Sequence, residues 1–387
     1  MTLKAAVVGA GFIGPVHIEA LRRLGIEVTG ILGHSLENTR RKVAQLRLPK
    51  AYETLDELLA EPGLTSVHIT TPNHLHAEMV RAALAAGKHV VCEKPLAMNA
   101  AEGQALLDLA EKSGLVHATN FNFRFYPLCQ ESKARVERGD LGQLYQITGR
   151  YAQDWLLKDT DWNWRLEPEL GGDMRAVADI GSHWLDLTRF VTGQDVTEVC
   201  ADFATFLPVR KKPTRPLETF AGKELQPDEY EAREISTEDY ASVLLHFSGG
   251  ARGALTVSQV SAGRKNHNAF ELSGASGSIA WNSERVEELW LGRRDEPSQI
   301  LLKDPTLMTE AGRRATEAPG GHAEGFRDTF KMLYERVYAA VDAGGPPAEP
   351  DYPTFADGVY ALRLGKAILE SARARAWVSV DKLTAGT

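Results

Sequence analysis

The sequence predicts an α/β protein of two domains: a doubly wound parallel sheet over residues 1–122, and an α+β domain with an antiparallel sheet over residues 123–387. Three observations lead to this prediction. The chain has 387 residues, which is more than a single hydrophobic core usually serves. Its first third alternates strand-like and helix-like segments. Beyond about residue 125, strand-like runs follow one another through glycine-rich turns, which is typical of hairpins.

The first domain opens on a short apolar strand. Short apolar runs predict its strands, and a helical spacing of apolar residues predicts the helices between them. Pro15 suits a first helical turn, Asn73 is expected to cap a later helix, and Gly87 to end it. The expected strands are KAAVV (4–8), EVTGILG (27–33), TSVHITTP (65–72), HVVCEKP (89–95) and VHATNF (116–121), and the expected helices are PVHIEALRRLG (15–25), LENTRRKVAQL (36–46), HLHAEMVRAALAAG (74–87) and AAEGQALLDLAEKSG (100–114).

The second domain contains longer strand-like runs. Several are separated by glycine-rich turns, which favours an antiparallel sheet. Residues 208–240 are polar and contain prolines, so we expect a long surface excursion there. The expected strands lie within GQLYQITGRYA (142–152), VTEVCADFATF (196–206), YASVLLHFSGG (240–250), ARGALTVSQVSA (251–262), NAFELSGASGSIAW (268–281) and VEELWLG (286–292).

Composition limits the classes of function. An apolar fraction of 43% and a charged fraction of 25% are ordinary for a globular enzyme, and a net charge of -8 offers no basic field for nucleic acid. The cysteines, Cys92, Cys129 and Cys200, are far apart and odd in number, which predicts neither a disulfide framework nor a metal motif. No signal peptide or run of about 18 apolar residues is evident. We expect a cytoplasmic protein without a membrane partner.

GAGFIG, residues 9–14, places a glycine turn between a strand and a helix. Gly9 permits a tight turn, Gly11 lets the backbone approach a pyrophosphate, and Gly14 brings the helix against the strand. The helix N-terminus then presents N–H groups to phosphates. The turn, which includes Phe12 and Ile13, predicts a dinucleotide site, with a glycine turn that holds no ligand as the alternative.

Cofactor choice is open at the end of the second strand. An acid about 20 residues beyond the first glycine usually binds the ribose 2′-hydroxyl of NAD. Here His34 and Ser35 occupy this place, and the first acid is Glu37. Ser35, Arg40 and Arg41 are candidates for binding the 2′-phosphate of NADP, whereas a solvated helix face explains the arginines equally well. We therefore expect NAD(P).

Three polar residues interrupt the apolar segment AVADIGSHWLDL, residues 176–187. Offsets of four and three place Asp179, His183 and Asp186 on adjacent turns of one helix face. We expect Asp186 to make a structural hydrogen bond or helix pair rather than a substrate contact. Asp179 and His183 are the stronger candidates for chemistry.

Other chemical candidates lie outside this helix. Lys94 ends a strand of the parallel sheet, where such sheets gather their ligands, and an ordinary surface lysine is the alternative. Trp164 and Arg165 could wall a cofactor or stack on a sugar. His322 lies in a glycine-rich loop and could reach a substrate or be simply a loop residue. No His, Cys, Asp or Glu spacing indicates a zinc site, so we expect no metal.

The segments GAGFIG, TTPNHLH, CEKPLA, NWR and DIGSHWLDL, in this order, resemble the glucose-fructose oxidoreductase / inositol dehydrogenase / MocA (Gfo/Idh/MocA) family over nearly the whole chain. The resemblance implies an N-terminal Rossmann domain and a C-terminal domain on a large open, mainly antiparallel sheet. It also implies a homodimer or homotetramer. Lys94, Asp179 and His183 would form a catalytic trio.

The resemblance implies ligand contacts residue by residue. The sequence departs from the family pattern at two places. The acid that binds the ribose is missing, and GGDMRAVAD replaces the shorter glycine-rich segment that usually precedes the helix, which changes the shape expected for the pocket near Asp173 and Arg175. Together with the candidates named from the residues alone, the expected cofactor contacts are Gly9, Gly11, Phe12, Ile13, Gly14, His34, Ser35, Thr71, Pro72, Asn73, His76, Glu93, Lys94, Asn122, Trp164 and Arg165, and the expected substrate contacts are Lys94, Asn122, Arg124, Arg175, Asp179, His183 and His322.

The expected activity is hydride transfer between NAD(P) and a secondary alcohol or ketone of a sugar, inositol or related polyol. A neutral imidazole suits proton removal near pH 7, so we expect His183 to be the general base. The Lys94 ammonium would stabilise the alkoxide, and Asp179 would bind a neighbouring hydroxyl. A glycoside-processing enzyme that retains its cofactor and a dinucleotide-binding regulator without chemistry are the alternatives.

Overall fold

The computed structural model describes residues 3–214 and 229–380, and the chain divides into two compact units. Unit 1 comprises Met1–Asn122 and Arg327–Leu362, and unit 2 comprises Phe123–Phe326 and Arg363–Thr387. The sequence boundary assigned all residues after 122 to one domain. That assignment is wrong for residues 327–362, because buried aromatic side chains of this segment pack on the sheet of unit 1.

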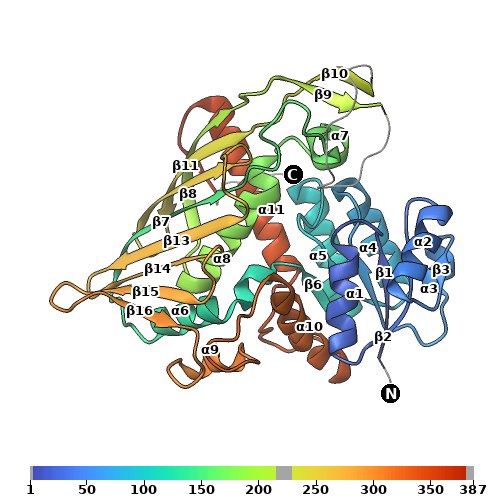
Figure 1. Ribbon diagram of the computed structural model, residues 1–387, viewed down its shortest axis with the longest axis horizontal. Helices are drawn as coiled ribbons and strands as arrows, with labels where there is room; N and C mark the ends of the chain where they lie inside the picture. The colour runs from blue at the N-terminus through green and yellow to red at the C-terminus, as the bar shows by residue number, and fades with distance from the viewer. Residues whose placement is uncertain (1–2, 215–228, 381–387) are drawn as a thin grey trace. The chain divides into compact units, whose positions relative to one another are not determined.

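Unit 1 contains a six-stranded parallel sheet in the order β3-β2-β1-β4-β5-β6, which confirms the doubly wound prediction (Figure 1, blue to teal). β3 was not predicted, because two residues are too few to show a periodic pattern. The strands are β1 (Lys4–Val8), β2 (Glu27–Leu32), β3 (Ala51–Tyr52), β4 (Ser66–Ile69), β5 (His89–Cys92) and β6 (His117–Thr119).

Helices cover both faces of this sheet. One face packs apolar side chains of α4 and α5 against residues such as Val67 and Val90. On the other face, His68 of β4 contacts His17 of α1 and Tyr334 of α10. The helices are α1 (Gly14–Arg23), α2 (Leu36–Leu46), α3 (Leu55–Leu59), α4 (His76–Ala85), α5 (Ala100–Ser113), α10 (Phe326–Asp342), which lies in this unit from Arg327, and α11 (Phe355–Ala374), which lies in this unit through Leu362.

The predicted cap at Asn73 is wrong. Asn73 begins a short 3-10 turn, Asn73–Leu75, and α4 follows from His76 without a side-chain cap. Gly87 lies just beyond the end of α4 with a φ of +69°, a conformation that glycine adopts at little cost.

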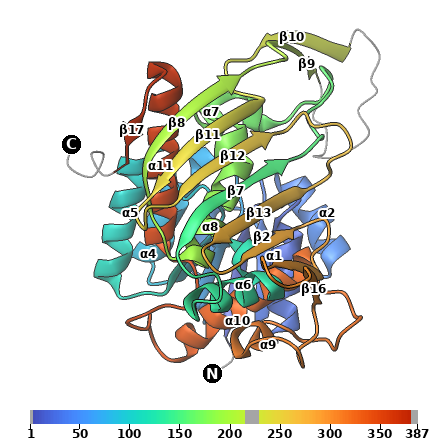
Figure 2. The same cartoon turned by 90° about the vertical axis from the view of Figure 1, so that its left-hand side faces the viewer.

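Unit 2 is built on a nine-stranded sheet in the order β16-β15-β14-β13-β7-β12-β11-β8-β17. Every neighbouring pair is antiparallel except β7 and β12, so the mainly antiparallel prediction is confirmed. Figure 2 shows one broad face of this sheet with no helix in front of it. The strands are β7 (Leu144–Ala152), β8 (Val196–Ala204), β11 (Tyr240–Phe247), β12 (Arg252–Ser258), β13 (His267–Gly274), β14 (Ser278–Asn282), β15 (Glu288–Gly292), β16 (Gln299–Leu302) and β17 (Val378–Ser379).

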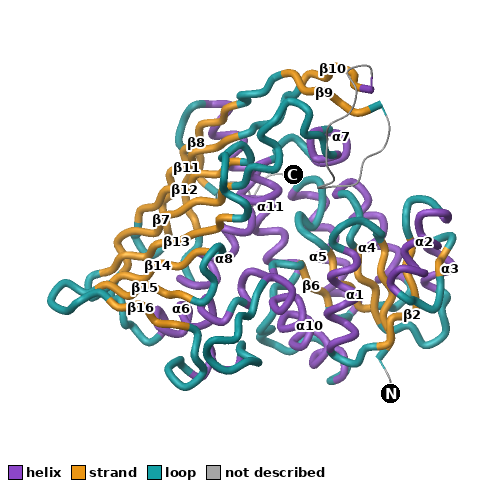
Figure 3. The backbone as a smooth tube through the Cα atoms, in the orientation of Figure 1, coloured by secondary structure: helices purple, strands orange, loops and turns teal. Residues whose placement is uncertain are grey.

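The opposite face of this sheet packs against α6 and α8 (Figure 3). Trp184 of α8 is fully buried and donates its indole N–H to the carbonyl of Ala269 at 2.8 Å. A Cβ at Gly149 would lie 2.4 Å from this indole nitrogen, so glycine is required beneath the tryptophan. The helices of this unit are α6 (Pro127–Glu137), α7 (Pro168–Gly171), α8 (Ser182–Thr192), α9 (Glu310–Arg314) and the remainder of α11.

The expected surface excursion at residues 208–240 is partly wrong. Its ends form the two-stranded sheet of β9 (Val209–Pro213) and β10 (Tyr230–Glu234), and Glu238 and Asp239 are buried. Residues 215–228 of this stretch lie outside the described residues. Among residues 3–214 and 229–380, no helix is both long enough and apolar enough to cross a membrane.

Candidate functional site

The glycine turn between β1 and α1 has the geometry of a dinucleotide cradle. Gly9 has a φ of +117°, and a Cβ there would lie 2.4 Å from Thr70 Oγ1. A Cβ at Gly14 would lie 2.1 Å from the carbonyl oxygen of Gly9. Around Gly11, by contrast, no heavy atom lies within 4 Å of such a Cβ. The first and third glycines are therefore needed for packing, and the second leaves open space where a pyrophosphate can approach.

The residues beside this turn differ in exposure. Phe12 is 58% exposed and Ile13 is half-buried. His34 is exposed, whereas the Ser35 hydroxyl accepts the Asn38 backbone N–H at 3.3 Å and caps α2. Capping gives Ser35 a structural role that the sequence analysis did not assign.

The strand ends beyond β4 and β5 lie at the same edge of the sheet as the glycine turn, because all three strands are parallel and adjacent in the order β1-β4-β5. Lys94, immediately after β5, is half-buried. Thr71 and Pro72 are also half-buried, and Asn73 is buried. This edge therefore collects the glycine turn, the segment after β4 and Lys94.

His76, one of the expected cofactor contacts, connects the segments that follow β4 and β5. Its ring is fully buried and lies between two carbonyl oxygens, at 2.8 Å from that of Pro95 and 2.9 Å from that of Thr71. Burial lowers the pKa of His76. His76 therefore ties the segment after β4 to the segment after β5, and its contact with the cofactor stays a prediction.

Glu93 is buried, accepts two N–H groups and lies within hydrogen-bond distance of the His17 ring. Oε1 accepts the Asn120 side-chain amide at 2.5 Å and lies 3.1 Å from His17 Nε2, and Oε2 accepts the Lys94 backbone N–H at 3.2 Å. Charge-assisted hydrogen bonds of this kind fix a carboxylate's orientation. Glu93 thus holds the backbone of Lys94 in place.

Asn122, one of the expected cofactor and substrate contacts, has a structural partner within unit 1. Its side chain is 1% exposed and donates to Thr329 Oγ1 of α10 at 2.7 Å. Asn122 therefore anchors α10 within unit 1.

In unit 2, the segment that carries Asp179 is not a regular α-helix. Residues Val177–Gly181 form a π-helical turn that leads into α8, and such turns are frequent at functional sites. Asp179 accepts Arg165 Nε at 2.9 Å through one oxygen and Gln259 Nε2 at 2.8 Å through the other. Asp179 and His183 were expected on one face of a regular helix. Because Asp179 lies in the π-helical turn and His183 in α8, this expectation is only partly met.

Trp164 and Arg165 form a stacked pair. The Arg165 guanidinium carbon lies 4.4 Å from the centre of the Trp164 ring, and both side chains are half-buried. Stacking and the ion pair with Asp179 together fix the guanidinium plane. Arg165 is therefore the residue that orients Asp179, a role that the sequence analysis did not assign.

His183 lies among aromatic side chains and is 8% exposed. Its ring centre is 4.9 Å from that of Phe123 and 6.2 Å from that of Tyr151. Tyr151 donates its hydroxyl to Asn266 Oδ1 at 2.6 Å, and burial raises its pKa well above 10. Tyr151 therefore stays a neutral phenol beside the imidazole.

Asp186 and Arg124 form a buried ion pair. The carboxylate receives Arg124 Nε at 2.8 Å and Nη2 at 2.5 Å, with side chains 4% and 10% exposed respectively. The guanidinium also lies 5.2 Å from the Phe190 ring centre. The ion pair gives Asp186 and Arg124 a structural role, as expected for Asp186, whereas the substrate contact expected for Arg124 stays a prediction.

Arg175, one of the expected substrate contacts, is held by buried carboxylates of unit 2. It is 1% exposed, donates Nε to the Glu238 carbonyl at 3.2 Å, and forms an ion pair with Asp239. Arg210 pairs with the same carboxylate at 2.8 Å. Although burial opposes ionisation, Arg175 lowers the pKa of Asp239, while burial raises the pKa of Glu238. This network is part of the interior of unit 2.

His322 is exposed, and its Nδ1 lies 3.4 Å from the Gly320 carbonyl oxygen. Its own carbonyl accepts the ammonium of Lys303 at 2.6 Å, and Lys303 also pairs with Glu324 at 2.8 Å. The loop is therefore anchored by a buried lysine, and the imidazole faces solvent.

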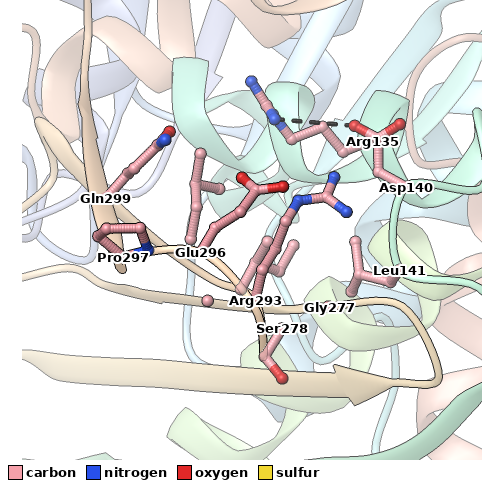
Figure 4. A pocket seen from close by; sticks show the side chains of 12 residues that line it. Arg135, Asp140, Leu141, Gly277, Ser278, Arg293, Glu296, Pro297 and Gln299 are labelled. Carbon is pink, nitrogen blue, oxygen red and sulfur yellow. Dashed lines mark ion pairs between the residues drawn. The ribbon is translucent and has the colours of Figure 1, made fainter.

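A cavity of about 130 Å³ lies in unit 2 near β14 and β15 (Figure 4). Its lining includes Arg135 and Asp140, which form an ion pair, together with Arg293 and Glu296. None of the residues expected at the active site lines this cavity, and its charges are of both signs. We assign it no role in the chemistry.

Two histidines of unit 1 were missed by the sequence analysis. His17 of α1 and His68 of β4 are fully buried, and their Nδ1 atoms are 3.0 Å apart. The available signal was a histidine inside an otherwise apolar run, HITT for His68 and the first helix for His17. Such positions are buried at a cost unless partners are supplied.

Comparison with known proteins agrees with this geometry. Residues 3–121 match the family described as "Oxidoreductase family, NAD-binding Rossmann fold", and residues 129–280 match the GFO/IDH/MocA C-terminal domain. Levoglucosan dehydrogenase of Pseudarthrobacter phenanthrenivorans is 28% identical over 99% of both chains. Myo-inositol 2-dehydrogenase of Thermotoga maritima is 26% identical over 98% of this chain and 99% of that protein.

A solved structure of levoglucosan dehydrogenase in complex with NADH and levoglucosan superposes with a TM-score of 0.86. It is 27% identical and covers 98% of this chain and 100% of that chain. The glycine cradle, the order of the parallel strands and both family matches lead to one conclusion. The chain belongs to the GFO/IDH/MocA family and is an NAD(P)-dependent oxidoreductase.

Proposed function

We propose that the protein oxidises a secondary alcohol of a sugar or related polyol, or reduces the corresponding ketone, with Lys94 and His183 acting on the substrate oxygen. The observation that carries this proposal is the arrangement along one edge of the unit 1 sheet. The open glycine turn follows β1, and the half-buried Lys94 follows β5, with only β4 between these strands. A dinucleotide cradle and a cation thus share one edge.

Each residue has a distinct task in this proposal. Bound NAD(P) supplies the hydride acceptor or donor. Lys94 binds the substrate oxygen and stabilises the negative charge that develops on it. His183 takes the hydroxyl proton during oxidation and returns it during reduction. Its aromatic neighbours, Phe123 and Tyr151, limit the access of water to the imidazole.

Asp179 is proposed to orient the substrate rather than to move protons. Arg165 and Gln259 each hold one of its two oxygens, which fixes the orientation of the carboxylate. Carboxylate oxygens are acceptors, so a substrate hydroxyl would donate to Asp179. A polyhydroxylated substrate is supported by the names of the relatives, which include dehydrogenases of levoglucosan and myo-inositol.

A substrate panel tests the proposal. Sugars, anhydrosugars and inositols are incubated with the purified protein and with NAD or NADP separately, and nicotinamide absorbance is followed. We expect net formation of NADH or NADPH with at least one member of the panel. Tightly bound cofactor in the purified protein, with glycoside cleavage but no net reduction, would instead indicate a glycoside-processing enzyme. Dinucleotide binding without any turnover would indicate a regulator.

A further inference from the structure

A chain of buried hydrogen-bonding side chains leads from Glu93 across one face of the unit 1 sheet. His17 Nε2 lies 3.1 Å from Glu93 Oε1, and His17 Nδ1 lies 3.0 Å from His68 Nδ1. His68 Nε2 lies 3.0 Å from the Tyr338 hydroxyl, which in turn lies 2.6 Å from Ser66 Oγ. We call His17, His68 and Tyr338 the buried relay.

The relay is enclosed by aromatic side chains. His17 and His68 are fully buried, and Tyr338 is 4% exposed. The Phe330 ring centre is 5.5 Å from that of His17, and the Tyr334 ring centre is 4.8 Å from that of His68. Polar atoms in such surroundings depend on one another for hydrogen bonds. The relay therefore functions as a connected set rather than as separate residues.

Counting donors and acceptors gives the proton positions when both imidazoles are neutral and the Glu93 carboxylate is ionised, because an ionised carboxylate only accepts. Burial, together with the nearby His17, lowers the pKa of His68 well below 6.5. A neutral imidazole has one donor and one acceptor. If His17 donates Nε2–H to Glu93, then its Nδ1 accepts, so His68 donates Nδ1–H and accepts the Tyr338 hydroxyl proton at Nε2. Every hydrogen bond then points toward the Glu93 carboxylate.

Glu93 links the relay to the catalytic edge. Its second oxygen accepts the Lys94 backbone N–H, and its first also accepts the Asn120 amide. A change in charge or orientation of this carboxylate therefore acts directly on Lys94. Among the described residues, the titratable groups that interact with Glu93 or with the two relay histidines include, besides the relay itself, Cys92, Lys94, His76 and Tyr334.

We infer that His17, His68 and Tyr338 are positioning residues that keep an N–H donor on the Glu93 carboxylate and thereby hold Lys94 in its reactive place. The inference rests on the proposed function, because it assigns its effect to Lys94. It adds to that function Tyr338 of α10, whose hydroxyl is linked to Glu93 through the imidazoles of His68 and His17.

The proton positions provide a test that needs no turnover. Nitrogen NMR of ¹⁵N-histidine-labelled protein at about pH 9, well above the ordinary histidine pKa of about 6.5, should show the proton on Nε2 of His17 and on Nδ1 of His68. In Tyr338→Phe, His68 loses its hydroxyl donor, and its nitrogen shifts should change. A proton on Nε2 of His68 in the unaltered protein at this pH would overturn the inference.

Matched variants provide the kinetic test. Tyr338→Phe removes one relay hydroxyl, whereas Tyr352→Phe removes a buried hydroxyl of the same unit that has no hydrogen-bond partner among the described residues. We expect Tyr338→Phe to lower kcat by about 2- to 12-fold, the range for one hydrogen bond, with the KM for dinucleotide unchanged. Tyr352→Phe should leave kcat unchanged.

Two variants of His17 separate donation from packing. His17→Gln can still present an N–H near the Nε2 position, whereas His17→Leu cannot. Because a carboxylate that loses a donor is protonated more readily, the acid limb of the kcat/KM profile should move to higher pH in His17→Leu and less in His17→Gln.

The outcomes separate the relay from the proposed function. Equal kcat and equal pH profiles in Tyr338→Phe, Tyr352→Phe and the unaltered enzyme would overturn the proposed role of the relay. This conclusion does not depend on the result for His17→Leu and holds even if that variant does not fold. Failure of the proposed function would appear differently, as an unaltered protein that turns over no sugar or polyol. In that case the NMR measurement alone would decide whether the relay exists.

Discussion

The buried ion pair between Asp186 and Arg124 allows one role assignment to be tested by stability and activity together. Replacing Asp186 by leucine leaves the Arg124 guanidinium without its carboxylate in a place where its side chain is 10% exposed. Removing one partner of a buried pair costs about 3–5 kcal/mol, because a buried charge is left uncompensated. For a domain the size of unit 2, about 2–4 °C of Tm is lost per kcal/mol. We therefore expect the Tm of Asp186→Leu to fall by roughly 6–20 °C.

The matched variant removes both charges. Arg124→Met combined with Asp186→Leu replaces the pair by apolar side chains of similar length, and such replacements are often neutral. The double variant should recover most of the stability lost in Asp186→Leu, so a double-mutant cycle in urea should show strong coupling. Turnover measured below the transition temperature should stay within about twofold of the unaltered enzyme, a range we set because neither residue is assigned to the substrate.

Two results would refute this reasoning. A Tm of Asp186→Leu within about 1 °C of the unaltered protein, well short of the loss expected for a broken buried pair, would show that the pair contributes no stability. A loss of turnover of about 100-fold or more in the folded double variant, the size seen for catalytic groups, would show that Asp186 or Arg124 acts on the substrate after all.

The other predictions concern the glycine turn, a buried histidine and the orientation of Asp179. Gly11→Ala should leave Tm unchanged but weaken dinucleotide binding measured by calorimetry. Gly9→Ala, whose Cβ would lie 2.4 Å from Thr70 Oγ1, should lower both Tm and dinucleotide affinity. Burial lowers the pKa of His117 from 6.5 to about 4. Between these pH values the unfolded chain binds a proton on His117 that the folded chain does not bind. The free energy of unfolding should therefore fall by about 3 kcal/mol as the pH is lowered from 6.5 to 4. Urea titrations of His117→Asn should show a weaker loss over this range. Arg165→Met should lower kcat by about tenfold, as expected from one charge-assisted hydrogen bond, and an unchanged kcat would show that Asp179 needs no such support.

The parallel sheet and most strands of unit 2 could be predicted because their apolar patterns extend over several residues. α3 and β3 were missed, since five and two residues carry no clear period. The assignment of residues 327–362 to unit 1 could not be predicted, because it depends on the burial of Tyr334 and Tyr338 against a sheet formed far earlier in the chain.

The candidate site, like the fold, could be predicted only in part from the sequence. The glycine turn and the place of Lys94 at the end of β5 follow from local sequence, because the residues concerned are neighbours in the chain. The structural uses of Arg124 and Arg175 do not, because their carboxylate partners are 62 and 64 residues away. The residues next to an arginine in the chain do not show whether its side chain binds a substrate or a buried carboxylate.

One comparison tests the claim that Lys94 and His183 perform the chemistry while the glycine turn binds the dinucleotide. Turnover of Lys94→Ala and His183→Ala is measured with the preferred sugar or polyol, on samples whose dinucleotide affinity has been determined by calorimetry. We predict a kcat lowered by about 10²- to 10⁴-fold in each variant, with dinucleotide affinity within a few-fold of the unaltered enzyme. Undiminished turnover in both variants would contradict the claim.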